Sequence, residues 1–476
     1  MQIMSSLEPT DSSATVADDA GSSGAGRILP AVFETLDGAG IPYCVLHGYE
    51  DYPQRITSDV DCVVDPGTAP GRLVALLHRH RDRIGAEVVR CSGSHIVLAG
   101  KAPDGSTCFL TLDVSVDCEL DGLPFYSGAE VLASRRRYRQ FWIPAADVAF
   151  GGYLARTITK GRVDDERGRR LGRLYREDPA GCERQVSRFW GAPGAELILS
   201  AARTGNWEPV RRHLDGLRAE LRRRAMLRRP GRFLRNRLHG QVDRLRRVWR
   251  PDGLNLVLLG PDGAGKSSVT DALGPRLAGV FARSACWGFA PAAVQRLLHG
   301  RNRSTDTPHA LPPRSFAMSV ARAVLYWFVY YQFGYVIRRL AMARSTLVLN
   351  DRHFVDVLVD PKRYRYGGPG WLVRLIWRVI PKPDLIVVLD APPEVLQARK
   401  QEVSFAETAR QRGAYRALAQ SLRNGHVVDA TRPLERVAGD VTDIVLRHLS
   451  MRVARRFGLG PDAARAGSRT TALPGV

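Results

Sequence analysis

Apolar residues in the first quarter of the chain recur at helical spacing and then at strand spacing. Ile28, Leu29, Val32, Phe33 and Leu36 lie on one helical face, and Gly38 and Gly40 follow as stop signals. Short apolar strands are expected at Tyr43–Leu46, at 61–64, and near 87–90, 95–98 and 107–117, with a helix over 72–80. This order predicts an α+β domain over 27–125, followed by a mainly helical extension over 126–210.

The hydrophobic pattern changes at Gly253 to repeated strand, loop and helix. The runs Leu254–Leu259, Leu347–Leu349 and Leu385–Leu389 are apolar without alternation. Such runs are typical of strands that are buried on both faces of a parallel sheet. The sequence therefore predicts an α/β domain with a parallel sheet over 251–450.

Residues 323–337 form the most apolar stretch, and Arg322, Arg338 and Arg339 flank it. A membrane-spanning helix needs about 20 apolar residues, and this stretch is shorter and contains Gln332. We expect a helix buried on the sheet. The alternative is an interfacial or dimer-forming helix, which would make the protein a homodimer.

Composition restricts the class of protein. The chain has 476 residues, of which 44% are hydrophobic and 25% are charged, so most of it can bury a core. The polar segments 1–26 and 451–476 are expected to be disordered tails. Seven cysteines form no C-x-x-C pair, which argues for reduced thiols and a cytoplasmic protein rather than a disulfide framework or zinc ribbon.

The net charge is +22, and residues 211–250 carry more than half of it, with 15 Arg and three acids. Leucines at helical spacing predict two basic amphipathic helices that link the two domains. A solvated connector is the favoured interpretation. An anionic membrane surface, with peripheral localisation, comes second. Nucleic acid comes third, because Phe233 and Trp249 are isolated and give no stacking array.

The segment Gly260–Ser267 matches the phosphate-loop pattern G-x-x-x-x-G-K-[ST], with a predicted strand before it and a predicted helix after it. Glycines allow backbone N–H groups to surround a phosphate at a helix N-terminus. Lys266 would reach the β- and γ-phosphates and Ser267 would bind Mg²⁺. ATP and Mg²⁺ are therefore the expected cofactors, held by Gly260, Gly263, Gly265, Lys266, Ser267 and Ser268.

Three segments in order resemble thymidylate kinases: the phosphate loop with Asp262, Asp351-Arg352 after an apolar strand, and Pro383-Asp384 through Asp390 to Glu394. The resemblance implies a P-loop kinase in which Asp351 holds Mg²⁺, Arg352 binds the acceptor phosphate and Asp262 touches an acceptor hydroxyl. None of the residues Pro261–Ala264 has a basic side chain. The positive charge near the transferring group would then come from Arg399, Lys400, Arg410 or Arg412.

The resemblance stops at 284–291, where the family's Arg-Glu-Pro-Gly-Gly-Thr segment has no counterpart. Instead, Lys362, Arg363 and Arg365 lie beside two tyrosines. We expect a phosphate-bearing acceptor, either a nucleoside monophosphate or a compound of glycan or lipid-linked sugar metabolism. The alternative is a non-catalytic nucleotide switch that docks on a membrane or partner.

A second acidic pattern lies in the N-terminal part. Gly48 is followed by Asp59-Val-Asp61, which runs into a strand. This pattern resembles nucleotidyltransferases, in which paired carboxylates on one side of a strand bind the metal ions that accompany a nucleoside triphosphate. Asp113 is the expected third ligand, with Asp117 in reserve. The alternatives are that nucleotidyl transfer is the main activity or that the domain is inactive and only binds.

Overall fold

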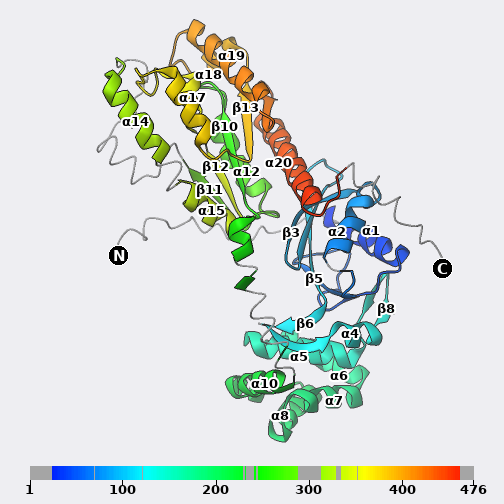
Figure 1. Ribbon diagram of the computed structural model, residues 1–476. Coiled ribbons are helices and arrows are strands. Elements are labelled where there is room, and N and C mark those ends of the chain that lie inside the picture. The colour runs from blue at the N-terminus through cyan, green and yellow to red at the C-terminus, as the bar shows by residue number, and fades with distance from the viewer. Residues whose placement is uncertain are drawn as a thin grey trace, which may run out of the picture. The chain divides into compact units, whose positions relative to one another are not determined.

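The structure is a computed structural model that describes residues 24–68, 70–120, 122–228, 231, 241–242, 245–287, 312–328, 334–350 and 352–460. The chain divides into two compact units (Figure 1). The N-terminal unit contains 18–244 together with 449–476. The C-terminal unit contains 245–448, with residues 1–17 assigned to it.

A five-stranded mixed sheet forms the centre of the N-terminal unit, in the order β1-β2-β5-β4-β3. β2 and β5 are parallel, and the other pairs are antiparallel. The elements up to the helical extension are α1 (Gly24–Gly38), β1 (Tyr43–Val45), β2 (Val60–Val64), α2 (Gly71–Arg79), α3 (Arg81–Ile84), β3 (Ala86–Ser92), β4 (His95–Lys101), β5 (Thr107–Ser115), β6 (Asp117–Leu120), β7 (Leu123–Ser127), α4 (Gly128–Ser134), β8 (Arg136–Tyr138) and β9 (Phe141–Ile143).

Alternation along β5 fixes which side chains face the core. Leu110, Leu112 and Val114 are buried, while the intervening Thr111 and Asp113 are partly exposed on the other face. The parallel register places Asp61 of β2 opposite Asp113 of β5. The strands expected in this region are confirmed, and the two predicted acids are neighbours across the sheet.

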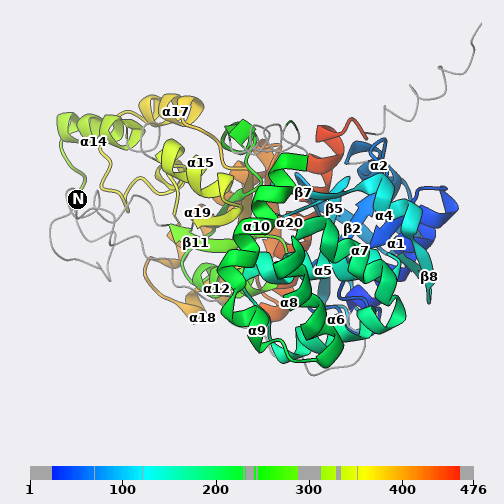
Figure 2. The same cartoon turned by 90° about the horizontal axis from the view of Figure 1, so that it is seen from below.

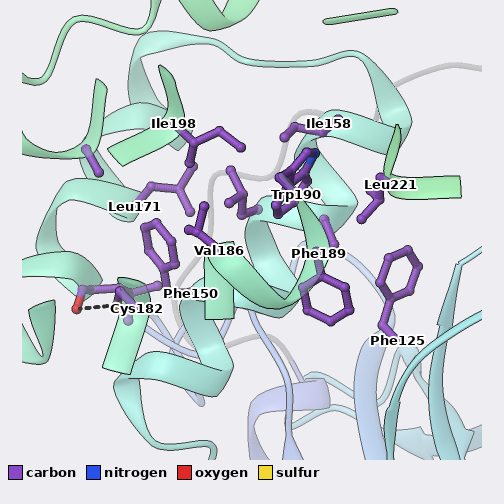
Figure 3. Packing of buried hydrophobic residues seen from close by; sticks show 14 of the residues in the cluster. Phe125, Phe150, Ile158, Leu171, Cys182, Val186, Phe189, Trp190, Ile198 and Leu221 are labelled. Atoms are coloured by element: carbon purple, nitrogen blue, oxygen red, sulfur yellow. Dashed lines mark hydrogen bonds between the residues drawn. The ribbon is translucent and has the colours of Figure 1, made fainter. Parts of the chain in front are cut away.

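The helical extension has a core of its own (Figure 3). Its helices are α5 (Ala146–Lys160), α6 (Asp165–Glu177), α7 (Pro179–Phe189), α8 (Ala192–Thr204), α9 (Glu208–Arg212) and α10 (Leu214–Arg228). Phe150, Phe189 and Trp190 are fully buried among these helices. Leu221 of α10 lies in the same core, and Leu217 O accepts a hydrogen bond of 3.0 Å from Trp190 Nε1.

This packing changes the interpretation of the basic segment. The face of α10 that the leucine spacing predicted is buried in the extension, so residues 214–228 belong to a folded unit rather than to a solvated connector. The predicted second helix and its break at Pro230 lie mostly outside the described residues, as does the expected tail over 1–26.

The C-terminal unit is built on an all-parallel sheet of five strands in the order β11-β12-β10-β13-β14. Its elements are β10 (Leu254–Leu259), α12 (Lys266–Arg276), β11 (Arg283–Trp287), α14 (Phe316–Phe328), α15 (Tyr335–Ala343), β12 (Thr346–Asn350), α16 (Asp356–Val359), α17 (Gly370–Val379), β13 (Leu385–Asp390), α18 (Pro393–Arg399), α19 (Phe405–Ser421), β14 (Gly425–Asp429) and α20 (Leu434–Arg456). β10, β12 and β13 are fully buried, which confirms the predicted parallel sheet.

Two sequence expectations fail in this region. The expected tail over 451–476 is wrong at its start, because α20 continues to Arg456 and Val453 is buried in the core of the N-terminal sheet. The described part of the apolar stretch 323–337 is not buried throughout. Val324 and Phe328 of α14 and Val336 of α15 are exposed, and residues 329–333 lie outside the described residues. None of the described helices combines the length and hydrophobicity that crossing a bilayer requires.

Candidate functional site

The loop after β10 has a backbone conformation that requires glycine. Gly260, Gly263 and Gly265 have φ angles of 145°, 86° and 86°. A Cβ atom on Gly260 would lie 2.6 Å from Leu389 O of β13, and one on Gly263 would lie 2.7 Å from Leu396 O of α18. The loop is thus pressed against two elements, and it ends at the N-terminus of α12. Its geometry suits a phosphate cradle.

Lys266 folds back over this loop. Its Nζ donates to Gly260 O at 2.8 Å and to Pro261 O at 3.0 Å. Burial lowers the pKa of Lys266 to about 8, although the Asp262 carboxylate opposes this shift. An ammonium that is desolvated in this way gains stability when an anion binds beside it.

The carboxylate of Asp262 is the meeting point of three cations. Lys266 Nζ lies 3.7 Å from Asp262 Oδ1, Arg352 Nη2 donates to the same oxygen at 3.2 Å, and Arg363 pairs with Oδ2. Burial alone would raise the pKa of Asp262, but Lys266 and Arg363 hold this pKa well below its usual range. The structure therefore brings together the predicted residues Lys266, Asp262 and Arg352.

A second carboxylate, which is buried, lies near Arg352. Burial lowers the pKa of Arg352, but Tyr364 and Asp356 outweigh this effect and raise it. Asp356 accepts hydrogen bonds of 2.8 Å from His353 N and from Tyr415 Oη. Burial raises the pKa of Asp356, and the Arg352 guanidinium opposes this. Asp356, which accepts the Tyr415 hydrogen bond, thus acts electrostatically on the predicted acceptor-binding arginine.

His353, the next residue of the Asp351-Arg352 motif, is a core residue. It is fully buried, and its ring packs edge-on against Trp377 at 5.7 Å between centroids. Burial lowers the pKa of His353 well below its usual value, so the imidazole is neutral. Its place in the motif is explained by packing and needs no chemical role.

Four cations were candidates for the charge near the transferring group. Among the described residues, Lys400 pairs with Glu402, Arg410 with Glu407 and Arg412 with Asp390. Arg399 instead donates to Ala430 O at 2.9 Å, and no described carboxylate pairs with it. Its Cβ lies 3.5 Å from the place of a Cβ on Gly263. Arg399 is therefore the least neutralised of the four candidates among the described residues, and its Cβ lies beside the loop.

Only part of the predicted Mg²⁺ site lies within the described residues. Ser267 and Ser268 lie exposed in the first turn of α12, but Asp351 lies outside the described residues. In the parts of the chain that the structure describes, no group of three or more His, Cys, Asp or Glu residues is arranged to hold a metal ion. The assignments of Ser267 and Asp351 to Mg²⁺ stay predictions.

The predicted acid pair of the N-terminal unit forms a cluster with two histidines. His47 Nε2 lies 3.2 Å from Asp61 Oδ2, while Arg156 Nη1 lies 3.6 Å from the same oxygen. His95 Nε2 lies 3.6 Å from Asp113 Oδ2 and 3.9 Å from Asp59 Oδ2. The three predicted acids therefore converge, but each faces an imidazole rather than a shared metal position.

Electrostatics in this cluster favour a neutral His47 imidazole. Burial, helped by Arg156, lowers the pKa of His47 to about 3. Burial raises the pKa of Asp61, and Asp113 and Asp59 add to that rise against Arg156. The reserve ligand Asp117 has a different task, because its Oδ1 accepts a hydrogen bond of 2.8 Å from Gly128 N at the start of α4.

Several residues of the C-terminal site were not singled out from the sequence. No sequence motif contains Asp356, Tyr415 or Glu402. Asp356, to which Tyr415 donates a hydrogen bond, raises the pKa of Arg352, and Glu402 pairs with Arg363. The basic and aromatic composition of 362–366 did mark Arg363, but only the folded loop brings it to Asp262.

Comparison with known proteins adds a partial match. A stretch of 81 residues is 35% identical to a probable thymidylate kinase of Pyrobaculum aerophilum. The stretch covers 16% of this chain and 42% of that relative, so the chain spans less than half of the relative's length. No protein-family model matches the chain.

The loop geometry predicts unequal costs at two glycines. Gly265→Ala should cost about 1–2 kcal/mol of unfolding free energy, because alanine at positive φ is strained but its Cβ meets nothing within 4 Å. Gly263→Ala carries the same strain and also a clash with Leu396 O. Chemical denaturation should therefore show a clearly larger loss for Gly263→Ala. Equal losses would mean that α18 does not constrain the loop.

Proposed function

We propose that the C-terminal unit is an ATP-dependent phosphotransferase that resembles thymidylate kinase. It acts on a phosphate-bearing acceptor, either a nucleoside monophosphate or a sugar phosphate of glycan precursor metabolism. The observation that carries the proposal is the convergence of Lys266, Asp262, Arg352 and Arg363 at a glycine cradle on a helix N-terminus. The partial likeness to a probable thymidylate kinase supports the same class.

Each residue has a defined task in this proposal. The loop N–H groups and Lys266 bind the β- and γ-phosphates, and Arg352 and Arg363 bind the phosphate of the acceptor. An ionised acceptor oxygen bonds to the γ-phosphorus while the bond from that phosphorus to the β–γ bridging oxygen breaks, which gives ADP and the phosphorylated acceptor. Bound Mg²⁺ would neutralise charge on the phosphates. Arg399, behind Gly263, would add positive charge near the transferring group.

Removal of the loop lysine should abolish phosphoryl transfer. We expect Lys266→Ala to lose at least about 100-fold in kcat, because the charge on the transferring group is then no longer balanced. The fold should remain, since Lys266 donates only to two loop carbonyls and lies beside Asp262. ADP release with and without acceptor, together with circular dichroism, measures both effects.

Exposed Lys101, in the other unit, provides a matched lysine control. Unchanged turnover in folded Lys266→Ala would contradict the proposal. Slow ADP release that does not depend on any acceptor would instead favour the nucleotide switch.

The lowered pKa of Lys266 predicts a pH-dependent affinity for ATP. The free ammonium loses its proton as the pH rises through about 8. ATP binds the protonated form, so affinity should be constant below this pH and fall by up to about tenfold per pH unit above it. Lys266→Met should bind more weakly and without this slope, as isothermal titration calorimetry between pH 7 and 10 can measure. Parallel curves for both proteins would refute the assignment.

A second candidate function belongs to the N-terminal unit. The register of Asp61 opposite Asp113, with Asp59 nearby, favours a nucleotidyltransferase-like site. His47 lies beside the Asp61 carboxylate and His95 beside the Asp113 carboxylate, so a divalent ion that binds these oxygens would have to displace the two imidazoles. The cations near His47, with Arg156 foremost, would suit the phosphates of a nucleotide.

The double variant Asp59→Asn/Asp61→Asn tests this candidate. We expect it to lose Mn²⁺ binding and the transfer of a labelled nucleotidyl group to acceptors, while phosphoryl transfer by the C-terminal unit continues. Asp117→Asn is the matched control, since Asp117 accepts a hydrogen bond from Gly128 N and is not one of the acids that face the histidines. If the wild type forms no nucleotidyl product and Mn²⁺ binding is the same in the double variant, the N-terminal unit is not such an enzyme.

A further inference from the structure

Helix α17 is apolar on two faces. The sequence of Gly370–Val379 is GWLVRLIWRV, in which every residue except the glycine and the two arginines is apolar. Val373 and Ile376 are buried on the inner face, where they share a core cluster with Ala323 and Tyr326 of α14, the helix beside α17 (Figure 2). Packing of this inner face explains why the helix forms. It leaves the apolar residues of the outer face outside the core.

The outer face of α17 is apolar and exposed. Trp371, Leu375 and Val379 follow one another at a spacing of four residues, so they form one stripe along the helix. Their exposed fractions are 60%, 48% and 49%. Arg374 and Arg378 lie beside this stripe and are also exposed. These five residues are called the α17 face below. A contiguous apolar stripe that faces water marks a surface that contacts something else.

The α17 face belongs to a wider apolar surface. Among the described residues, more than half of the large apolar side chains that are exposed lie on α14, α15 and α17. On α14, which packs against α17, Phe316, Met318 and Val324 are exposed. This concentration distinguishes the surface from the single exposed apolar residues that are normal on soluble proteins.

The charge of this surface is positive. Residues 361–383 contain six basic residues and no acid, and residues 312–350 contain no acid either. Within the part of the chain that the structure describes, no carboxylate pairs with Arg374 or Arg378. A tryptophan and aliphatic side chains flanked by arginines are typical of a helix that lies in the interface of an anionic membrane.

The charge also decides between a membrane and a second copy of the chain. In a symmetric dimer the same face meets itself, so Arg374 and Arg378 would lie close to their own counterparts and repel them. Anionic headgroups instead attract arginines, while an apolar stripe enters the boundary between headgroups and acyl chains. Ten helical residues measure about 15 Å, half of the hydrocarbon thickness, so α17 can lie on a bilayer but not cross it.

We infer that the α17 face docks on an anionic membrane surface. Trp371, Leu375 and Val379 enter the interface, and Arg374 and Arg378 lie at the lipid headgroups. This surface is different from the basic segment 211–250. The inference does not depend on the proposed phosphotransferase, because it concerns where the C-terminal unit is held and not which group it transfers.

Vesicle binding by the full-length protein tests the inference. Flotation with vesicles of phosphatidylcholine that contain one quarter phosphatidylglycerol measures the bound fraction at low salt. We expect Trp371→Ala/Leu375→Ala to weaken binding by about tenfold or more, because two apolar side chains no longer enter the interface. Arg374→Gln/Arg378→Gln should weaken binding by about tenfold on these vesicles and little on pure phosphatidylcholine, which carries no net charge.

Two control variants match these changes. Phe405→Ala removes an exposed aromatic side chain from α19 and should bind as the wild type does. Trp249→Ala removes an exposed tryptophan from the basic segment and should also leave binding intact. Circular dichroism establishes that each variant is folded. If the apolar double variant does not fold, the arginine double variant, which changes only exposed side chains, still decides.

The depth of Trp371 in the bilayer provides a second readout. Phospholipids with brominated acyl chains quench the fluorescence of tryptophans that enter the bilayer, and the chain has eight tryptophans. Quenching should therefore be stronger in the wild type than in Trp371→Phe, which keeps an aromatic ring but lacks the reporter. A purely structural role of Trp371 would not produce this difference.

Four results would overturn the inference. They are failure of the wild type to bind anionic vesicles, equal binding by the wild type and both double variants, and equal quenching in the wild type and Trp371→Phe. The fourth is a dimer, seen by analytical ultracentrifugation, that Trp371→Ala/Leu375→Ala dissociates, since the face would then join two copies. Loss of binding in Trp249→Ala alone would place the membrane contact in residues 211–250 and equally refute the α17 face.

Discussion

The carboxylate of Asp262 holds together three cations that would otherwise repel one another. Like charges that are held close together in a partly buried site repel one another. Lys266, Arg352 and Arg363 come from three separate segments: the phosphate loop, the end of β12 and the loop after α16. This half-buried carboxylate, together with Asp356 and Glu402, therefore orders segments that are far apart in the sequence.

Sequence reasoning succeeded where the signal is local. The phosphate loop is a run of consecutive residues, and the strands β10, β12 and β13 are continuous apolar runs, so pattern and spacing were enough to locate them. The edge strands β11 and β14 contain Arg283 and His426 and are more exposed, so they gave no such run. Arg363 lies 101 residues from Asp262 in the sequence, and no local pattern encodes that ion pair. The same holds for Tyr415 and Asp356, which only the packing of α19 brings together.

The two units carry charged clusters of different composition. In the C-terminal unit Lys266, Arg352 and Arg363 meet at Asp262, and Asp356 and Glu402 lie near the two arginines. In the N-terminal unit Asp59, Asp61 and Asp113 lie beside two imidazoles and Arg156. The overall charge of +22 hides this difference. Many of the other arginines form exposed ion pairs, such as Arg203 with Glu183, and such pairs contribute little to stability.

Helix α20 contributes to the cores of both units, since Val445 is buried in its first part and Val453 is buried in the core of the N-terminal sheet. This has a consequence for biosynthesis. Domains usually fold in the order in which the ribosome makes them. Here the N-terminal sheet, with strands complete by residue 115, must wait for residue 453 before its core is filled. The C-terminal unit is thus synthesised before the last part of the core of the N-terminal unit can form.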